Sequence, residues 1–313
     1  MEGDCAASGM ISAVVLTKNS SRTIRRCLEG LASADPRPSE LMVVDGGSTD
    51  GTLDIVREYS GAFRIRVLHD RGLGYGYARD VGWRAASGDY VAMIDSDVVV
   101  ARDFLGRAAE LLERDPGLGA VGGKLRPELD PGERGLIAKF QVRNLAITLH
   151  QRDPPYPATV PGVHTACTVF RRRALEEVGG FSHKFVLAKE DSDVSYRLIK
   201  RGYRLSLVDS TCRHLETGRR FARTNFKYGR SYAVISREHP DLAPLWTPKN
   251  VAMTAAALIP ALQPLVLGWY FRRYVRDAGM PPREALGMAS VEALRQFLRY
   301  SGMIHQLIRG GYA

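Results

Sequence analysis

Cysteine is scarce in this sequence of 313 residues, which contains four cysteines and no CxxC pair. Zinc sites and dithiol redox motifs need clustered thiols, so the scattered Cys5, Cys27, Cys167 and Cys212 argue against both and favour a reducing compartment. Lysine is also scarce, because 8 of the 44 basic residues are Lys and the others are Arg. A hydrophobic fraction of 45% and a charged fraction of 25% exclude a disordered chain.

An acidic surplus and a signal peptide are also missing. The formal net charge of +10 favours an anionic partner, which charge alone leaves open as a phosphate-bearing substrate, an anionic membrane surface or nucleic acid. The first residues, "MEGDCAASG", are acidic and lack an apolar core, so we expect residues 1–9 to form a flexible leader and not a signal peptide.

Strand and helix patterns alternate in the first third of the chain. Four buried strands are predicted in "MISAVVLT", "ELMVVD", "FRIRVLHD" and "YVAMID", with helical patterns between them. After the second strand, Ser48, Thr49 or Asp50 can cap a helix that begins near Thr52. This β-α-β order predicts an α/β fold with a doubly wound, mostly parallel sheet and helices on both faces.

The fourth strand ends in two carboxylates, in "YVAMIDSDVVV". In extended chain Asp95 and Asp97 point the same way, and paired hard oxygen donors suit a divalent cation such as Mg²⁺ or Mn²⁺. Ligands bind at the carboxyl edge of open α/β sheets, which favours this interpretation. The alternative is a turn in which an Asp caps the following helix.

Three glycines in "GLGYGYARD" allow a dinucleotide-binding interpretation. Their spacing is GxGxG, however, and they follow the third strand instead of the first. Gly72, Gly74 and Gly76 are therefore poor evidence for an NAD site.

Three segments together resemble glycosyltransferase family 2, the nucleotide-sugar enzymes of the GT-A fold: "VVDGGSTDGT", "GYARDVGWRAASGDYVAMIDSD" and "EVGGFSHKFVLAKEDSDVSYRLIKRGYRL". The resemblance covers residues 10–235. It implies a metal-dependent inverting transfer of a sugar from a UDP- or GDP-linked donor to an acceptor hydroxyl. No nucleic-acid partner is expected.

The resemblance also implies roles for residues at the donor site. Asp95-Ser96-Asp97 matches the family's DXD motif, in which Asp97 would hold the Mn²⁺ or Mg²⁺ and His214 would add a further contact. The nucleotide pocket would be lined at the ends of the first two strands by Thr17, Asn19 and Asp45. Gly46 stands where many members carry a second acidic residue, so the base of the donor is left open.

A second pair of donor-site residues comes from the helix before the DXD motif. Arg79 and Asp80 match the family's "ARN" segment beside the nucleotide, with Asp replacing the commoner Asn. A helix-surface ion pair with a neighbour is the alternative.

The pair Glu190-Asp191 precedes a helix with Val194, Leu198 and Ile199 on one face, ended by Gly202. Acidic residues there can simply complement the helix dipole. By resemblance this pair is the family's ED motif, with Asp191 as general base and Glu190 orienting the acceptor. Asp193 is expected to face solvent or cap the helix, and His164 to line the acceptor pocket or pack within its loop.

The remaining residues, 236–313, are expected to be helical and associated with a membrane. "VAMTAAALIPALQPLVLGWYF" is long enough to cross a bilayer, but Pro260, Gln263 and Pro264 leave open a kinked span, a re-entrant hairpin, an interfacial helix or a buried helix pair. A basic amphipathic helix follows, with a predicted apolar stripe at Leu286, Val291, Leu294, Leu298 and Ile304. These features place the enzyme at the cytoplasmic face of the cell membrane, acting on a glycan or polyprenyl-linked acceptor.

Two other functions are compatible with parts of the sequence. A sugar nucleotidyltransferase shares the α/β architecture, but its Gly-rich N-terminal loop is missing after "AVVLTKN". A non-catalytic nucleotide-binding membrane protein would not need Asp95, Asp97 and Asp191.

Overall fold

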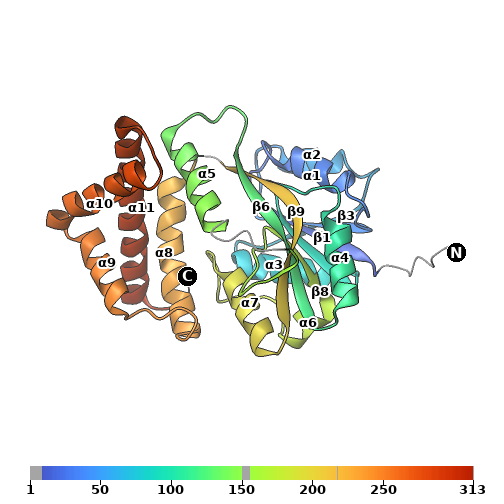
Figure 1. Cartoon of the computed structure of the whole chain (residues 1–313). Helices are drawn as coiled ribbons and strands as arrows, with labels where there is room; N and C mark the ends of the chain where they lie inside the picture. The colour runs from blue at the N-terminus through green and yellow to red at the C-terminus, as the bar shows by residue number, and fades with distance from the viewer. Residues whose placement is uncertain (1–8, 150–155, 217, 313) are drawn as a thin grey trace. The chain divides into compact units, whose positions relative to one another are not determined.

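A computed structural model of the chain describes residues 9–149, 156–216 and 218–312. The expected leader, with Cys5, and part of the Pro-rich loop before Tyr156 lie outside these residues. The chain forms two compact units, coloured by residue number in Figure 1. The catalytic unit comprises residues 1–128, 146–186 and 190–215, and the helical unit comprises residues 129–145, 187–189 and 216–313.

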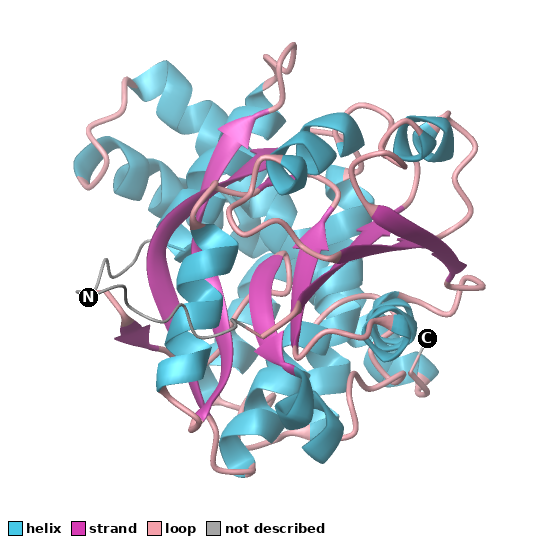
Figure 2. Ribbon diagram, turned by 90° about the vertical axis from the view of Figure 1, so that its right-hand side faces the viewer, coloured by secondary structure: helices cyan, strands magenta, loops and turns pink. Residues whose placement is uncertain are grey.

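The catalytic unit is built on one nine-stranded sheet (Figure 2). Its order is β3-β2-β1-β4-β8-β6-β9-β5, and β7 pairs with β9. The strands are β1 (Ile11–Thr17), β2 (Glu40–Asp45), β3 (Arg64–His69), β4 (Tyr90–Asp95), β5 (Val98–Val99), β6 (Leu118–Leu129), β7 (Ala158–Thr159), β8 (Cys167–Arg171) and β9 (Arg204–Glu216).

The first four strands are parallel, as their alternation with helices predicts. β1 lies inside the sheet and all seven of its residues are buried. In this register Thr17 lies opposite Asp45 on β2, and Leu16 lies opposite Asp95 on β4. The carboxyl ends of β1, β2 and β4 therefore meet at one edge of the sheet, where α/β folds bind ligands.

The other half of the sheet is mixed. β8 runs antiparallel to both β4 and β6, and β9 runs antiparallel to β5 and β7. The short β5 follows the DXD segment directly, and its pairing places Val98 opposite His214 on β9. This pairing brings a residue more than a hundred positions away beside Asp97.

Helices cover both faces of the sheet, which confirms the predicted doubly wound class. One core packs α1, α2 and α4 against the sheet, and the other packs α3, α6 and α7 against the opposite face. Alternate residues of β1 enter the two cores: Ala13 and Val15 enter the first, and Val14 and Leu16 enter the second. The helices are α1 (Ile24–Ala32), α2 (Thr52–Arg57), α3 (Tyr75–Ala85), α4 (Phe104–Arg114), α6 (Arg172–Glu177) and α7 (Glu190–Lys200).

The glycines at the start of α3 serve close packing. A Cβ on Gly74 would lie 2.3 Å from the Val186 carbonyl oxygen, and one on Gly76 would lie 2.1 Å from the Ser182 carbonyl oxygen. The backbone amides of Tyr75 and Gly76 donate to the Val186 and Phe185 carbonyls. These contacts account for Gly74 and Gly76, and the positive φ of Gly72 (+74°) accounts for the third glycine, without a dinucleotide.

Replacing Gly76 by Ala should therefore destabilise the catalytic unit by about 2 kcal/mol, because the new methyl group must push backbone aside. Gly61→Ala is the matched control, since nothing lies within 4 Å of a Cβ at that position. Thermal unfolding followed through the buried Trp83 measures both variants. Equal melting temperatures for the two would contradict the packing role.

The helical unit contains α5 (Leu136–Leu149), most of which belongs to it, with α8 (Phe221–Glu238), α9 (Pro248–Leu258), η1 (Pro260–Leu262), α10 (Gln263–Arg276) and α11 (Pro282–Arg309). Its core includes Phe140, Phe221, Met280 and Met288. α8 and α11 touch backbone to backbone, because a Cβ on Gly229 would lie 1.8 Å from the Arg299 carbonyl oxygen and one on Gly302 would lie 2.1 Å from the Phe226 carbonyl oxygen.

The apolar stripe predicted for α11 is partly wrong. Val291 is buried and Leu298 packs against the core, but Leu286 and Leu294 are 50% and 44% exposed. Small residues such as Ala285, Ala289 and Gly302 take the inward face instead. Close approach of two helices selects small side chains, which a search for large apolar residues overlooks.

Candidate active site

The turn after β2 is organised by Asp45. This carboxylate is buried and accepts hydrogen bonds from the Gly47 amide (3.0 Å), the Ser48 amide (3.0 Å) and the Ser48 hydroxyl (2.6 Å). Asp50 then accepts from the amide and hydroxyl of Thr52, but the N-cap residue of α2 is Gly51, so none of the three predicted candidates occupies the N-cap position. Asp45 thus fixes the shape of the predicted nucleotide-pocket loop from within.

The end of β1 is linked to the same turn by Asn19. The side-chain oxygen of Asn19 accepts a hydrogen bond from the Thr49 backbone amide (2.8 Å), and the backbone amide of Asn19 donates to the Ser48 hydroxyl (2.9 Å). The hydroxyl of Thr17 is buried and has no hydrogen-bond partner among the described residues. A buried hydroxyl of this kind marks a place where a ligand or water completes the bonding.

Gly46, the position that departs from the family pattern, lies beside Lys18 and Asp70. A Cβ there would lie 3.1 Å from Lys18 Cδ and 3.4 Å from Asp70 Oδ2. Asp70, which follows β3 at the same sheet edge, was not predicted as a site residue. Its carboxylate puts a negative charge next to the position where the expected acidic residue is missing.

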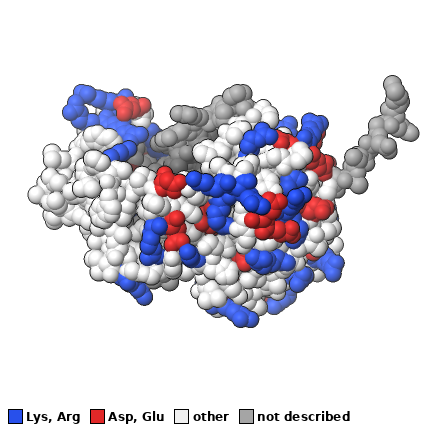
Figure 3. Space-filling view, turned by 90° about the horizontal axis from the view of Figure 1, so that it is seen from below, with Lys and Arg blue, Asp and Glu red and all other residues white. Residues whose placement is uncertain are grey.

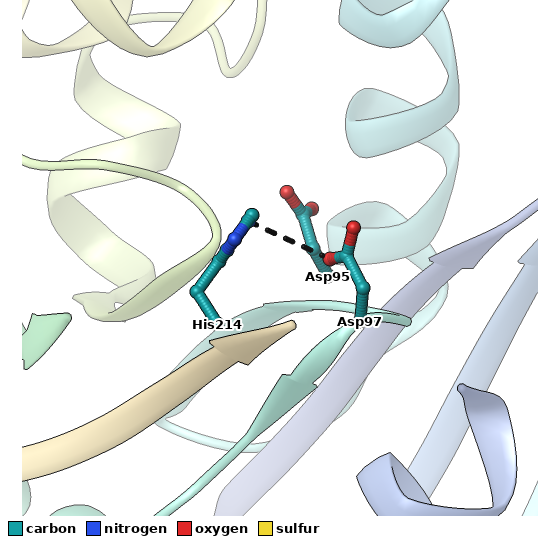
Figure 4. A group of neighbouring side chains, drawn as sticks. All are labelled: Asp95, Asp97 and His214. Atoms are coloured by element: carbon teal, nitrogen blue, oxygen red, sulfur yellow. Dashed lines mark ion pairs between the residues drawn. The ribbon is translucent and has the colours of Figure 1, made fainter. Parts of the chain in front are cut away.

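Asp95, Asp97 and His214 converge beyond the end of β4, as Figure 4 shows. Each offers one ligand atom, and these atoms lie within 4.8 Å of one another. His214 Nε2 lies 3.7 Å from Asp97 Oδ1, and the Leu215 amide donates to the Asp97 carbonyl oxygen at 2.9 Å. Two carboxylates and an imidazole form a donor set that fits Mn²⁺ well and Mg²⁺ through its oxygens.

Ser96, between the two carboxylates, ties this loop to the loop after β1. Its hydroxyl lies 2.9 Å from the Ser20 hydroxyl, and the Ser20 amide donates to the Thr52 hydroxyl at 2.8 Å. The loops after β1, β2 and β4 are thus joined by hydrogen bonds into one surface.

Arg79 connects Asp95, the first carboxylate of the DXD segment, to the start of α7. Its buried guanidinium donates from Nη2 to Asp95 Oδ1 (2.8 Å) and from Nε to Glu190 Oε1 (2.9 Å). Burial alone would lower the pKa of Arg79, but the adjacent Asp95 and Glu190 more than offset this effect and hold the pKa above its ordinary value. Arg79 is therefore a buried, charged bridge, and the helix-surface alternative is wrong.

Asp80 belongs to a different network. Its Oδ1 accepts from Trp83 Nε1 (2.7 Å) and from the Phe181 amide (3.2 Å), and its Oδ2 bonds Arg84 and His183. The structure thus separates Asp80 from the Asp95 group that Arg79 joins. Two of its four partners, Phe181 and His183, fasten the segment 181–183 to α3.

The two carboxylates of the predicted ED motif differ in accessibility. The Glu190 side chain is 8% exposed and is bound to Arg79, whereas the Asp191 side chain is 25% exposed. Burial raises the pKa of Glu190 above its ordinary value, an effect that Arg79 opposes and Asp191 reinforces. Asp191 is the more accessible carboxylate of this pair.

Asp191 is oriented by its neighbours. Its Oδ1 accepts from the Ser192 amide (2.6 Å) and the Ser192 hydroxyl (3.2 Å), which leaves Oδ2 only 3.5 Å from Nδ1 of the exposed His164. From the sequence, His164 was expected either to line the acceptor pocket or to pack within its loop. Its place beside Asp191 was not predicted, because no local pattern links residues so far apart.

Two expectations about α7 are wrong. Asp193 is buried and bonds Arg197 (2.6 Å), so it is not solvent-facing, because the arginine one turn later compensates its charge. Ile199 is 41% exposed, and the buried residues of the helix are Val194 and Leu198 together with Glu190, Asp193 and Ser195. Gly202, with φ of +98°, follows the end of the helix as expected.

The fold is also that of known glycosyltransferases. A mannosyltransferase from Pyrobaculum calidifontis, solved with GDP-mannose and Mn²⁺, superposes with a TM-score of 0.59 over 97% of this chain and 87% of its own, at 22% identity. Staphylococcus aureus TarS residues 1–349, solved with UDP-GlcNAc, gives a TM-score of 0.54 over 97% and 93% of the two chains, at 18% identity. The strand order of the sheet, the site at its carboxyl edge and the likeness to these solved structures together define a GT-A fold.

Residues 12–179, more than half of the chain, match the sequence model of glycosyl transferase family 2, and the chain belongs to this family. A pre-mycofactocin glycosyltransferase of Mycobacterium tuberculosis is 32% identical over 246 residues, 75% of this chain and 49% of the relative. A poly-beta-1,6-N-acetyl-D-glucosamine synthase of Staphylococcus aureus is 28% identical over 60% of this chain and 45% of its own. This chain thus spans about half the length of these relatives. Membership of this family favours a glycosyltransferase over a sugar nucleotidyltransferase or a non-catalytic protein.

Proposed function

We propose that this glycosyltransferase moves a sugar, with inversion, from a nucleotide-diphosphate donor to an acceptor hydroxyl, with a divalent cation at Asp95, Asp97 and His214. The observation that carries the proposal is the bridge through Arg79, which joins the carboxylate Asp95 to the start of α7, where Asp191 is accessible. Donor and acceptor chemistry would then lie on two sides of one buried guanidinium.

The residues of the chain have separate tasks in this proposal. When bound, the cation would neutralise charge on the departing diphosphate. The turn held by Asp45 and Asn19, together with Thr17 and Ser96, would bind the nucleotide. Asp191 would accept the proton of the acceptor hydroxyl as that oxygen bonds to the anomeric carbon and the bond to the diphosphate breaks. A single base suffices for inversion, because the leaving group departs from the opposite face.

Asp191 is favoured over Glu190 for proton transfer on accessibility. Glu190 is enclosed and paired with Arg79, so its expected role is to hold α7 and orient the acceptor side. His164 lies close enough to Asp191 to orient that carboxylate or receive its proton.

The acceptor that we propose is a lipid-linked or cell-envelope glycan, used at the cytoplasmic face of the membrane. Nucleotide sugars are mostly cytoplasmic, which supports the side of the membrane. The basic and apolar character of the helical unit supports the membrane itself.

A panel of UDP- and GDP-linked sugars tests the proposed reaction. We expect one donor to release its nucleotide slowly in the presence of Mn²⁺ and not in EDTA, with water acting as a poor acceptor. Nucleotide release followed by chromatography is the measurement. A donor turned over equally well in EDTA would contradict the cation, and binding of no donor by the folded protein would contradict the proposal.

A further inference from the structure

The net positive charge of the chain comes from one of its two units. The catalytic unit contains 26 Lys and Arg and 26 Asp and Glu, so it is formally neutral. The helical unit contains 18 basic and 8 acidic residues, which accounts for the whole net charge of +10. A net positive charge on the helical unit attracts anions to the surface of this unit.

The same unit exposes an apolar hairpin, which comprises α9, η1 and the first part of α10. No charged residue occurs between Val251 and Phe271. Large side chains of this segment face outward, with Leu265 69%, Trp269 55% and Ile259 46% exposed. Figure 3 shows a broad surface of the helical unit without Lys, Arg, Asp or Glu. Exposed apolar surface of this extent marks an interaction site.

Two polar side chains of the hairpin, Thr254 and Gln263, form hydrogen bonds within it. Gln263 donates from its side chain to the Ala256 and Ala257 carbonyls across the bend, and the Thr254 hydroxyl donates to the Asn250 carbonyl (2.7 Å). Pro260 and Pro264 have no amide hydrogen to satisfy. A backbone that enters a lipid environment must meet this requirement, whereas a bend in water need not.

No single helix of the hairpin is long enough to cross a bilayer. Among the described residues, no single helix has the length and hydropathy of a span, although the pair 248–258 and 260–276 meets that test together with a bend of 97°. α9 has 11 residues and α10 has 14, and α10 ends in charged residues. At about 1.5 Å per residue neither approaches the roughly 30 Å of a hydrocarbon core.

Basic and aromatic residues border the hairpin. Arg272, Arg273 and Arg276 are exposed at the end of α10, and Lys249 is exposed at the start of α9. The guanidinium of Arg273 lies over the ring of Trp269, 5.6 Å from its centroid. Tryptophan and arginine in this combination are typical of the headgroup zone of a membrane.

We propose that the hairpin 248–276 seats the protein in one leaflet of an anionic bilayer, with Leu265 and Trp269 at the headgroup boundary and the arginines on lipid phosphates, without crossing the membrane. The occupant is a lipid surface and not a second protein copy, because the apolar hairpin is bordered by cations with few acidic residues that could pair with them. The inference does not depend on the reaction catalysed.

The experiment uses the full chain and vesicles of phosphatidylcholine, with or without phosphatidylglycerol. We expect flotation with the anionic vesicles, reduced by high salt, and little flotation with the neutral ones. Leu265→Glu should weaken partitioning about tenfold or more, because a buried leucine side chain contributes that much to transfer. Leu294→Glu, at an exposed position on α11, is the matched control and should float normally.

Depth is measured by fluorescence quenching with spin-labelled lipids in a Trp246→Phe variant, because Trp83 is buried and Trp269 is then the exposed tryptophan among the described residues. Shallow labels should quench most strongly. Strongest quenching at the bilayer centre would overturn the interfacial mode. Normal flotation of Leu265→Glu with loss in Leu294→Glu, or a wild-type chain that self-associates and ignores vesicles, would overturn the proposal.

Discussion

Asp191→Asn should lose sugar transfer by about 10²-fold or more while keeping its affinity for the donor, because general-base assistance has that typical size. The amide keeps the shape of the carboxylate and its oxygen can still accept from Ser192, so the fold should not change. The measurements are transfer under saturating donor and the dissociation constant of the donor nucleotide. A parallel fall in both would mean that Asp191 serves the donor site instead.

Glu190→Gln is the informative comparison for that variant. Glu190 is enclosed and pairs with Arg79, so removing its charge should lower the melting temperature as well as activity, with a loss of about 1 to 3 kcal/mol in stability. Asp191 is more exposed, and its replacement should leave stability unchanged. Full activity in Asp191→Asn beside an inactive but stable Glu190→Gln would reverse the two roles.

Asp97→Asn should abolish the dependence of nucleotide binding on Mn²⁺. A carboxamide is a far weaker ligand for a divalent cation than a carboxylate, and we expect a loss of about tenfold or more in Mn²⁺-supported affinity. Because the Asp97 side chain is 41% exposed, the substitution should not disturb the core. Titration with nucleotide in the presence and absence of Mn²⁺ measures the affinity for the nucleotide. Electron paramagnetic resonance measures the binding of Mn²⁺ itself.

The control for Asp97→Asn is Asp54→Asn, which removes an exposed carboxylate from α2 in the same unit. It changes the net charge by the same amount and should bind nucleotide and Mn²⁺ like the unaltered chain. If Asp97→Asn retained the same Mn²⁺ response as this control, the cation would not be held by Asp97.

The sequence predicted the features that depend on local pattern. Alternating strand and helix periods identified the parallel half of the sheet, and parallel strands necessarily bring Thr17, Asp45 and Asp95 to one edge. The carboxyl pair at Asp95 and Asp97 was conspicuous because carboxylates are costly to bury in a strand. His214 was suggested only by resemblance, because the β5 and β9 pairing that brings it to Asp97 joins distant segments.

Features that depend on long-range contact could not be predicted. Arg79 and Glu190 are 111 positions apart, and no spacing rule connects them. The inward face of α11 was misjudged for another reason: Gly229 and Gly302 let two backbones touch, so small residues occupy the contact and Leu286 and Leu294 remain outside. Periodicity identifies a repeating face, whereas the choice between two faces depends on the partner helix.

The shared guanidinium of Arg79 has a thermodynamic consequence. One cationic group balances Asp95, on the proposed donor side, and Glu190, on the proposed acceptor side, so charge added at either carboxylate changes the attraction left for the other. Any such effect is reciprocal: whatever donor binding does to acceptor affinity, acceptor binding must do equally to donor affinity. Variants at Arg79 would therefore shift both affinities together, and the two binding events would be energetically linked by this single side chain.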